Sequence, residues 1–520
     1  MADDDGAGRG EAHDVCTLGA GGGDEVPVAP WPLLMRHRMG RARLSVHGSD
    51  SYRWWVLWTV LAGLFSVNIT FTLFAIAQER IARDLHTDVN GLTWAITLPL
   101  LAFGVAAPAA GKLGDMFGHR RLALIGMVGS MVAAAASALA VNVGMLIVVR
   151  TVGQILGAAT ASASMALIFR VFDRDDRVKA MGWWSLIGAG GPVIGVVIGG
   201  PVIETIGWRW MFWFQVPSLA AAALVAVVVL PGFARPHGAD GPRAHPSFDV
   251  AGTVTLSIGV TSLLLALNRG PASGWTSPYV LAAIVACPLG LVAFWRVERR
   301  AASPLLPLAW LGRRNFTLPI AAQAFGNFAY MGGFILAPRL LDRYFGFGET
   351  KIGLVSIARP LTFSLLAPAA GYAAVRLGER TTALFGAMAM GSSMLCFALL
   401  TRSSGLGLVI LALALSGAGM GVASPSLASL VANTVEESSM GIASAAQQLT
   451  TQIGLVAGIQ ILSTVQSATE PGSGLVGSFG NAYRLGAAVA LLAGLCALFV
   501  RSTSRAPARD EAADMAPAAV

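Results

Sequence analysis

Fourteen apolar segments, each about 20 residues long, follow one another between residues 54 and 500. A helix of about 20 residues is just long enough to cross the hydrocarbon core of a bilayer. Inside that core only helices and closed barrels satisfy all their backbone hydrogen bonds. The chain is therefore predicted to be an all-α polytopic membrane protein with fourteen spans. The predicted spans are 54–76, 92–111, 122–140, 144–169, 180–203, 213–233, 250–268, 279–297, 316–338, 352–375, 382–400, 405–430, 441–464 and 482–500.

The composition agrees with a chain embedded in a lipid bilayer and argues against other classes. Hydrophobic residues make up 55% of the 520 and charged residues only 12%, whereas soluble proteins carry about 25% charged residues. The net charge of +8 comes from arginines in the loops, so we expect no nucleic-acid partner. The four cysteines are scattered singly, without the spacing of a metal site. The sequence also lacks a phosphate-binding loop and a Ser/His/Asp set, which predicts no cofactor and no enzyme activity.

The distribution of Lys and Arg predicts the orientation. If both termini lie on one side, the segments on that side hold 25 of the 36 basic residues, and the opposite loops hold nine. Loops that stay in the cytoplasm carry such an excess, so both termini are predicted to be cytoplasmic in a plasma-membrane protein. The polar stretches 1–53 and 502–520 are predicted to be disordered tails, and the first lacks the apolar core of a signal peptide.

One predicted cytoplasmic loop, Gly111-Lys-Leu-Gly-Asp-Met-Phe-Gly-His-Arg-Arg121, combines glycines with charges of both signs. Glycines permit tight bends and close approach of helix ends. The glycines of this predicted gating loop are Gly111, Gly114 and Gly118, and its basic residues are Lys112, Arg120 and Arg121. The carboxylate of Asp115 is expected to bind either a helix N-terminus or a basic partner.

A second copy of this boundary occurs later in the chain. Ala107–Gly111 and Ala367–Gly371 share the sequence Ala-Pro-Ala-Ala-Gly, and in both copies a second glycine follows seven residues later. In the second copy Val375 stands where the first has Asp115. Related halves with the substrate site between them are the expected construction of secondary transporters. The first loop is therefore expected to carry more of the gating.

The gating loop closely resembles the signature of the major facilitator superfamily of secondary transporters. With six spans in each half, the seventh and eighth spans are left as a central insertion, which resembles the fourteen-span drug:H+ antiporter subfamily. Other segments match marks of that subfamily in the same order: Gly207–Phe212 followed by Gln215-Val-Pro217, Phe248–Gly252, Gly274-Trp275 and Pro304–Pro307. The family usually has Asn where Gln215 stands.

The resemblance implies a major facilitator fold, in which two six-helix bundles surround a central cavity and two further helices are inserted between them. The N-terminal bundle is expected at 54–235, the linker with the inserted helices at 236–313, and the C-terminal bundle at 314–501.

Arg150, in the fourth predicted span, is a candidate for the mechanism. An arginine inside a span is costly and normally faces the protein interior or water. The resemblance implies that it couples proton movement to substrate binding, and Gln154 and Gly157 follow on the same helical face. The alternative is a snorkelling or structural arginine.

The fifth predicted span resembles the antiporter signature of exporters. Its small residues and proline, which let helices pack closely or kink, are Gly188, Gly191, Pro192 and Gly195. Val196 stands where a further glycine is common. Ordinary packing of small residues is the alternative.

The first predicted span departs from the subfamily pattern. Alignment on Ile81–Leu85 places Thr70 where an aspartate is usual. A buried carboxylate is the simplest proton carrier, but no carboxylate falls in the middle of a predicted span. Glu79 and Glu204, at span edges, are therefore the candidate proton carriers, with solvated helix-end charges as the alternative.

Polar positions at helical spacing are candidates for the substrate cavity. They are Asn68, Thr72, Gln154, Gln323, Asn327, Tyr330, Arg359 and Gln448. Inside a membrane such groups need partners or water, and they could instead hold helices together. Arg359 matches no family motif, so a contact to an anion in the pore and a structural bond to a carbonyl both stay open. The few charges favour an uncharged or amphipathic substrate.

With the resemblance, these patterns predict a monomeric secondary transporter that exports hydrophobic or amphipathic small molecules, such as drugs or secondary metabolites, by H+ antiport. Two alternatives remain. One is a proton-uncoupled facilitator or metabolite importer, which Thr70 favours. The other is a membrane sensor without transport, against which the intact loop at 111–121 argues.

Overall fold

The computed structural model describes residues 51–87, 89–231, 249–301, 304–401 and 404–501. All of them belong to one compact unit of the chain, and the other unit, Met1–Gly48, lies outside the described residues. The two tails predicted to be disordered also lie outside them, apart from residues 51–53.

All regular elements in these described ranges are helices, so the predicted all-helical fold is confirmed. The first helices are α2 (Tyr52–Asp84), α3 (Val89–Phe117), α4 (His119–Ala138), α5 (Val143–Val171), α6 (Arg174–Ile206) and α7 (Arg209–Val229). A hairpin of α8 (Val250–Ser273) and α9 (Pro278–Glu298) follows, and then the short helix η1 (Leu308–Gly312). The last helices are α10 (Arg314–Arg343), α11 (Glu349–Ser356), α12 (Ala358–Leu377), α13 (Glu379–Ala398), α14 (Leu406–Asn433), η2 (Glu437–Ser439) and α15 (Met440–Phe499).

Local sequence explains where several of these helices begin and end. Gly118 separates α3 from α4 with φ +97°, and Gly378 separates α12 from α13 with φ +87°. Residues with a β-carbon rarely adopt this conformation, so glycine permits both sharp turns. At the start of α5 the side chain of Asn142 accepts a hydrogen bond from the Met145 N–H at 2.8 Å, which is the usual role of an N-cap residue.

The long element α15 covers both the thirteenth and the fourteenth predicted span. It has 60 residues, but Gly474 has non-helical dihedrals (φ +70°) and divides it into two helices. Pro471, three residues earlier, cannot donate a backbone hydrogen bond to the preceding turn. The tenth predicted span includes most of α11 and most of α12, and Ile357 between them keeps a right-handed helical conformation (φ −60°, ψ −29°).

In the part of the chain that the structure describes, eleven helices are long and apolar enough to cross a membrane. The helices α2 and α6 are not among the eleven, although they coincide with the first and fifth predicted spans. The total of fourteen spans therefore stays a prediction.

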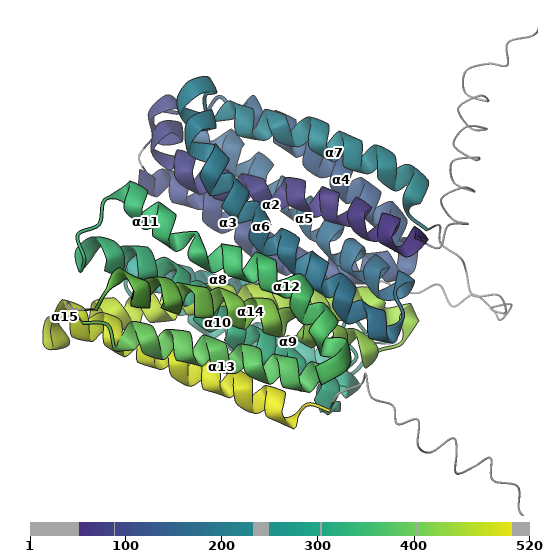
Figure 1. Ribbon diagram of the computed structural model, residues 1–520. Coiled ribbons are helices and arrows are strands. Elements are labelled where there is room, and N and C mark those ends of the chain that lie inside the picture. The colour runs from purple at the N-terminus through teal and green to yellow at the C-terminus, as the bar shows by residue number, and fades with distance from the viewer. Residues whose placement is uncertain (1–50, 88, 232–248, 302–303, 402–403, 502–520) are drawn as a thin grey trace, which may run out of the picture. The chain divides into compact units, whose positions relative to one another are not determined.

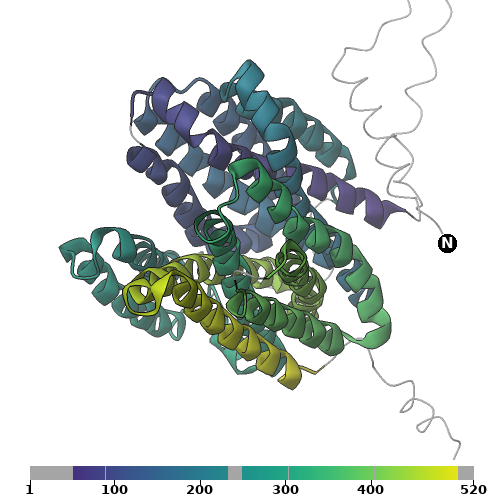
Figure 2. The same ribbon diagram turned by 60° about the vertical axis from the view of Figure 1, so that its left-hand side comes forward.

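The helices pack in two groups, which Figures 1 and 2 show from two directions. Helices α2–α7 form the first group, with a core around Phe74 and Trp208, and α10–α15 form the second, with a core around Met394 and Tyr483. Two crossings join the groups: α3 and the neighbouring α5 pack against α15, and α6 packs against α12 and α14. The hairpin helix α8 lies against α3 and α15.

Candidate functional site

Asp115 of the predicted gating loop connects the two groups of helices. Its Oδ1 accepts the backbone N–H of Gly441 at 3.1 Å, and its Oδ2 accepts that of Ile442 at 3.0 Å. Both N–H groups lie in the first turn of α15, where no partner exists within the helix. The carboxylate is therefore bonded to a helix N-terminus, whose partial positive charge favours an anion. This was one of the two partners expected for Asp115.

Basic partners of Asp115 are present as well. His119 Nε2 lies 3.0 Å from Asp115 Oδ1, and Arg170 Nη2 lies 3.4 Å from the same oxygen. His119 is buried, and its other ring nitrogen has no hydrogen-bond partner among the described residues. The carboxylate is thus held by the imidazole of its own loop, by the guanidinium of Arg170 at the end of α5 and by the first turn of α15.

Glycines bring the backbones of α3 and α15 into contact beside Asp115. A β-carbon on Gly111 would overlap the carbonyl oxygen of Gly441, and a β-carbon on Gly441 would overlap that of Gly111. Glycine is therefore required on both helices at this crossing. Gly114 has a related role, because a β-carbon there would overlap the ring of His119.

The other basic residues of the loop point to different partners. Lys112 Nζ donates to the carbonyl of Pro304, at 3.0 Å, in the segment after α9. Arg120 Nη2 donates to the carbonyl of Val227 near the end of α7. Arg121 is exposed. The loop therefore contacts the inserted hairpin region and α7 as well as α15.

The second copy of the motif lies at the other crossing, between α12 and α6. A β-carbon on Gly371 would lie 2.6 Å from the carbonyl oxygen of Val178, and one on Gly182 would lie 2.6 Å from that of Ala367. The glycine-to-carbonyl contact of the first crossing is thus repeated. Val375 has no carboxylate with which to bind a helix N-terminus.

At this second crossing a series of hydrogen-bonded side chains connects the two groups in place of Asp115. Glu379, 1% exposed, accepts a hydrogen bond from Ser429 Oγ at 2.7 Å and one from Asn433 Nδ2 at 3.4 Å. Asn433 Oδ1 in turn accepts from Arg177 Nη1 of α6 at 2.9 Å. Arg177 Nε also donates to the carbonyls of Phe169 and Phe172. The connection between the groups here is an arginine, an amide and a carboxylate.

Arg150 lies inside the first group and is buried. Its Nε donates to the carbonyl of Ala95 at 3.0 Å, and its guanidinium lies 3.7 Å from the ring centroid of Phe74 and 5.7 Å from that of Phe212. No carboxylate of the described ranges forms an ion pair with it. An arginine over aromatic faces is stabilised by the ring quadrupoles, so its charge is accommodated without a counter-ion.

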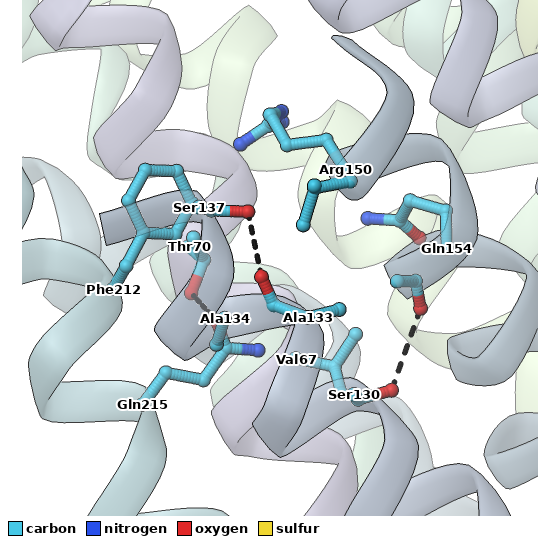
Figure 3. A pocket seen from close by; sticks show the side chains of 12 residues that line it. Val67, Thr70, Ser130, Ala133, Ala134, Ser137, Arg150, Gln154, Phe212 and Gln215 are labelled. Atoms are coloured by element: carbon cyan, nitrogen blue, oxygen red, sulfur yellow. Dashed lines mark hydrogen bonds between the residues drawn. The ribbon is translucent and has the colours of Figure 1, made fainter. Parts of the chain in front are cut away.

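Arg150 and Gln154 line a small cavity inside the first group, together with Thr70 and Gln215 (Figure 3). The cavity has about 40 Å³ of space, enough for roughly two or three water molecules. Thr70 Oγ1 donates to Gln215 Oε1 at 3.0 Å. Two of the positions that depart from the subfamily pattern therefore contact one another, and a neutral hydrogen bond occupies the place of the usual aspartate.

Four predicted substrate-cavity residues of the second group form two contacting pairs on α10 and α12. Asn327 Nδ2 donates to the carbonyl of Gln323 at 2.8 Å. Arg359 is fully buried, its guanidinium lies 4.2 Å from the ring centroid of Tyr330, and its Nη2 donates to the Tyr330 carbonyl. The structural bond to a carbonyl, one of the two roles considered for Arg359, is therefore present.

Other predicted site residues are separate from these clusters. Asn68 and Gln448 are half-buried on α2 and α15. Gly188 is exposed, and a β-carbon there would contact nothing. Seven residues named in the sequence analysis lie outside those whose side chains the structure describes. They are Thr72, Glu79, Gly191, Pro192, Gly195, Val196 and Glu204.

Two residues at the crossings were not expected from the sequence. His119 follows Gly118, and Glu379 follows Gly378 at the same place in the second copy. Both are buried, and each makes hydrogen bonds at its crossing. The shared position in the repeat was a signal that could have identified them.

The sequence matches the family described as Major Facilitator Superfamily over residues 59–346 and again over residues 320–519. It is 29% identical to the tetracenomycin C resistance and export protein of Streptomyces glaucescens, over 82% of this chain and 79% of that protein. It is 31% identical to the puromycin resistance protein of Streptomyces alboniger, over 72% of this chain and 68% of that protein.

Solved structures share the fold. The human organic anion transporter MFSD10 superposes with a TM-score of 0.62 at 16% identity, over 86% of this chain and 99% of that one. The proton:xylose symporter XylE superposes with a TM-score of 0.62 at 15% identity, over 87% and 97% of the two chains.

Proposed function

Since this chain belongs to the major facilitator superfamily, we propose that it exports hydrophobic or amphipathic small molecules across the cell membrane in exchange for protons. The relatives named for resistance to tetracenomycin C and puromycin, and a multidrug transporter of Bacillus subtilis at 26% identity, support export of such compounds. The proposal includes the fourteen-span arrangement, a monomer, and cytoplasmic termini.

The observation that carries the proposal is the contact between Asp115 and the first turn of α15. Transport by alternating access needs a closure between two groups of helices that is strong enough to hold and weak enough to open. Hydrogen bonds to a charged group contribute about 1.5–3 kcal/mol each, and reversing a two-state population from 1:99 to 99:1 takes about 5.5 kcal/mol. Two such bonds therefore have the size that a reversible closure requires. We place this closure on the cytoplasmic side.

The polar residues at the centre of each group support a substrate of low charge. Arg150 and Arg359 are held by aromatic rings and backbone carbonyls, so neither needs a substrate anion for its stability. In the proposal the substrate is bound mainly by apolar and aromatic surface. The energy comes from the proton gradient.

Export can be tested with inside-out membrane vesicles and the amphipathic dye ethidium. An acid-inside pH gradient should drive ethidium into vesicles that contain this protein, and collapse of the gradient with nigericin should abolish accumulation. Vesicles without the protein provide the background. The proposal fails if accumulation never exceeds that background for ethidium or for other amphipathic dyes.

One observation favours a second function, proton-uncoupled transport of a metabolite. The neutral hydrogen bond between Thr70 and Gln215 stands where the subfamily usually has an aspartate. A facilitator needs no titratable group at this place. In the same vesicles a facilitator would equilibrate its substrate at a rate that nigericin leaves unchanged.

A further inference from the structure

Two motifs of the chain have no part in the closure at Asp115. They are Phe248–Gly252 before the inserted hairpin and Pro304–Pro307 after it. Glu298, the last residue of α9, lies between them and is 4% exposed. Its Oε1 accepts the N–H of Leu306, and at the start of α8 Asp249 Oδ1 accepts the N–H of Gly252 at 2.7 Å. Each carboxyl group therefore uses one oxygen to hold the backbone.

The remaining oxygens of the two carboxyl groups lie together. A β-carbon on Gly252 would overlap Asp249 Oδ2 and would lie 3.0 Å from Glu298 Oε2. Both oxygens are buried, and neither has a hydrogen-bond partner in the described part of the chain. Buried carboxylate oxygens without a donor are costly. A proton between the two would satisfy both.

The surrounding charges favour one proton on this pair, held by Glu298. Two carboxylates in one site disfavour double ionisation. Asp249 lies at the N-terminus of α8, where a negative charge is stabilised, whereas Glu298 lies at the C-terminus of α9, where it is destabilised. The Glu298 Oε2–H can then donate to Asp249 Oδ2.

Among the residues that the structure describes, Lys112 is the buried cation that interacts with the pair. Lys112 of α3 is 8% exposed and interacts electrostatically with Asp249, Glu298 and Asp115. On α9 and the turn after it, the cations near Glu298 are Arg296, Arg299 and Arg300, and all three are exposed. Lys112 also donates a hydrogen bond to the carbonyl of Pro304. Leu306, two residues later, donates its N–H to Glu298. The pair is thus connected to the gating loop through one short segment.

We propose that Asp249 and Glu298 form a proton-binding site, which shares one proton while α3 and α15 are closed and releases it when they separate. On release, the proton leaves Glu298 Oε2 for water, and two carboxylates remain. Lys112, which interacts electrostatically with both, can neutralise them, and its backbone adjoins Gly111 at the crossing with α15. The release of this proton during transport rests on the proposed function, proton exchange. The presence of a shared proton between Asp249 and Glu298 does not depend on that function.

The shared proton can be tested without transport. We expect purified protein at neutral pH to show the infrared band of a protonated carboxyl group, and both Glu298→Gln and Asp249→Asn to lose it. Glu436→Gln changes an exposed carboxylate near the start of α15 and is the control, with the band unchanged. If the Glu298→Gln spectrum keeps the band, no proton is shared at this pair.

Coupling is tested in the ethidium assay with the same variants. Gln at position 298 can still accept from Leu306 and donate to Asp249, so the folded protein and its dye binding should be retained. Accumulation driven by the pH gradient should fall by about tenfold or more, a change of about 1.4 kcal/mol, while gradient-independent ethidium exchange continues. Full gradient-driven accumulation in Glu298→Gln would overturn the coupling. If the unaltered protein shows no gradient-driven transport, the proposed function fails, and the infrared band still decides whether the proton is shared.

Discussion

The two crossings between the helical groups share a backbone arrangement but differ in the charges that hold them. Gly111 approaches the Gly441 carbonyl at the first crossing, and Gly371 approaches the Val178 carbonyl at the second. At the first, Asp115 bonds directly to the N-terminus of α15. At the second, Arg177 reaches across from α6 to an amide on α14.

The difference concerns how many groups must change for a crossing to open. The first depends on one carboxylate that serves two N–H groups, so removing one charge weakens both bonds. The second divides its bonds among several buried side chains, each with more than one partner. We therefore expect the first crossing to respond more strongly to neutralisation, while both depend on their glycines.

The largest effect is expected from Gly111→Val. Its side chain would overlap the Gly441 carbonyl and approach Ala445 Cβ, so α3 and α15 could no longer pack together. Inserting extra methyl groups into a packed site costs about 1–3 kcal/mol. Ethidium transport should fall to background, with protein still present in the membrane.

The control for this change is Gly405→Ala, because a β-carbon there would contact nothing and the φ of −70° suits alanine. Gly371→Val extends the comparison to the second crossing and should be equally harmful. If Gly371→Val transported normally, tight contact would be needed at only one of the two crossings.

Asp115→Asn should have the next largest effect. The asparagine oxygen can accept only one of the two N–H groups in full, and the charge at the helix N-terminus is lost. A loss of about 1.5–3 kcal/mol corresponds to a population shift of roughly ten- to a hundredfold. The expected result is at least tenfold slower ethidium transport at normal protein amounts. Spin-label distances between the adjacent ends of α3 and α15 should lengthen.

Val375→Asn provides the matched change at the second copy. It also introduces an amide, but no bond to a helix N-terminus is lost, so transport should stay close to normal. If Asp115→Asn and the unaltered protein transported ethidium at equal rates, the contact at Asp115 would have no role in transport.

Local features of these crossings could be predicted from the sequence, but their partners could not. The turns at Gly118 and Gly378 follow from glycines at matching places in a repeat, and apolar segments of sufficient length predict membrane helices one by one. By contrast, Asp115 and Gly441 are 326 residues apart, and only the packing of α3 on α15 brings them together. For this reason the sequence left Asp115 with two possible partners, and both are present.

The region around Thr70 is a second case in which the sequence did not reveal a contact between distant residues. In the sequence Thr70 and Gln215 were two separate departures from a pattern. Their hydrogen bond joins positions 145 residues apart, and a single sequence holds no sign of such a pairing. Glu298 was overlooked for a similar reason: its burial depends on the segment around Leu306 folding back over the end of α9.

Asn433→Leu should weaken the second crossing to a smaller extent. The change removes the amide between Arg177 and Glu379 and replaces it with an apolar group of similar size. Arg177 keeps its two carbonyl partners and Glu379 keeps Ser429, so about 1–2 kcal/mol should be lost. We expect roughly five- to thirtyfold slower transport and a thermal midpoint lower by a few degrees in detergent. Ser429→Ala removes the other donor to Glu379 and leaves the link to Arg177, so it should lower stability without slowing transport as much.

The smallest effect is expected from Glu379→Gln, although the carboxylate of Glu379 is more buried than that of Asp115. Its glutamine oxygen can still accept from Ser429 and Asn433. What is lost is a negative charge in the first turn of α13, which contributes about 0.3–1 kcal/mol. Ethidium transport should therefore fall by no more than about two- to fivefold. If Glu379→Gln were as harmful as Asp115→Asn, charge would control both crossings alike, and the asymmetry inferred from their contacts would be wrong.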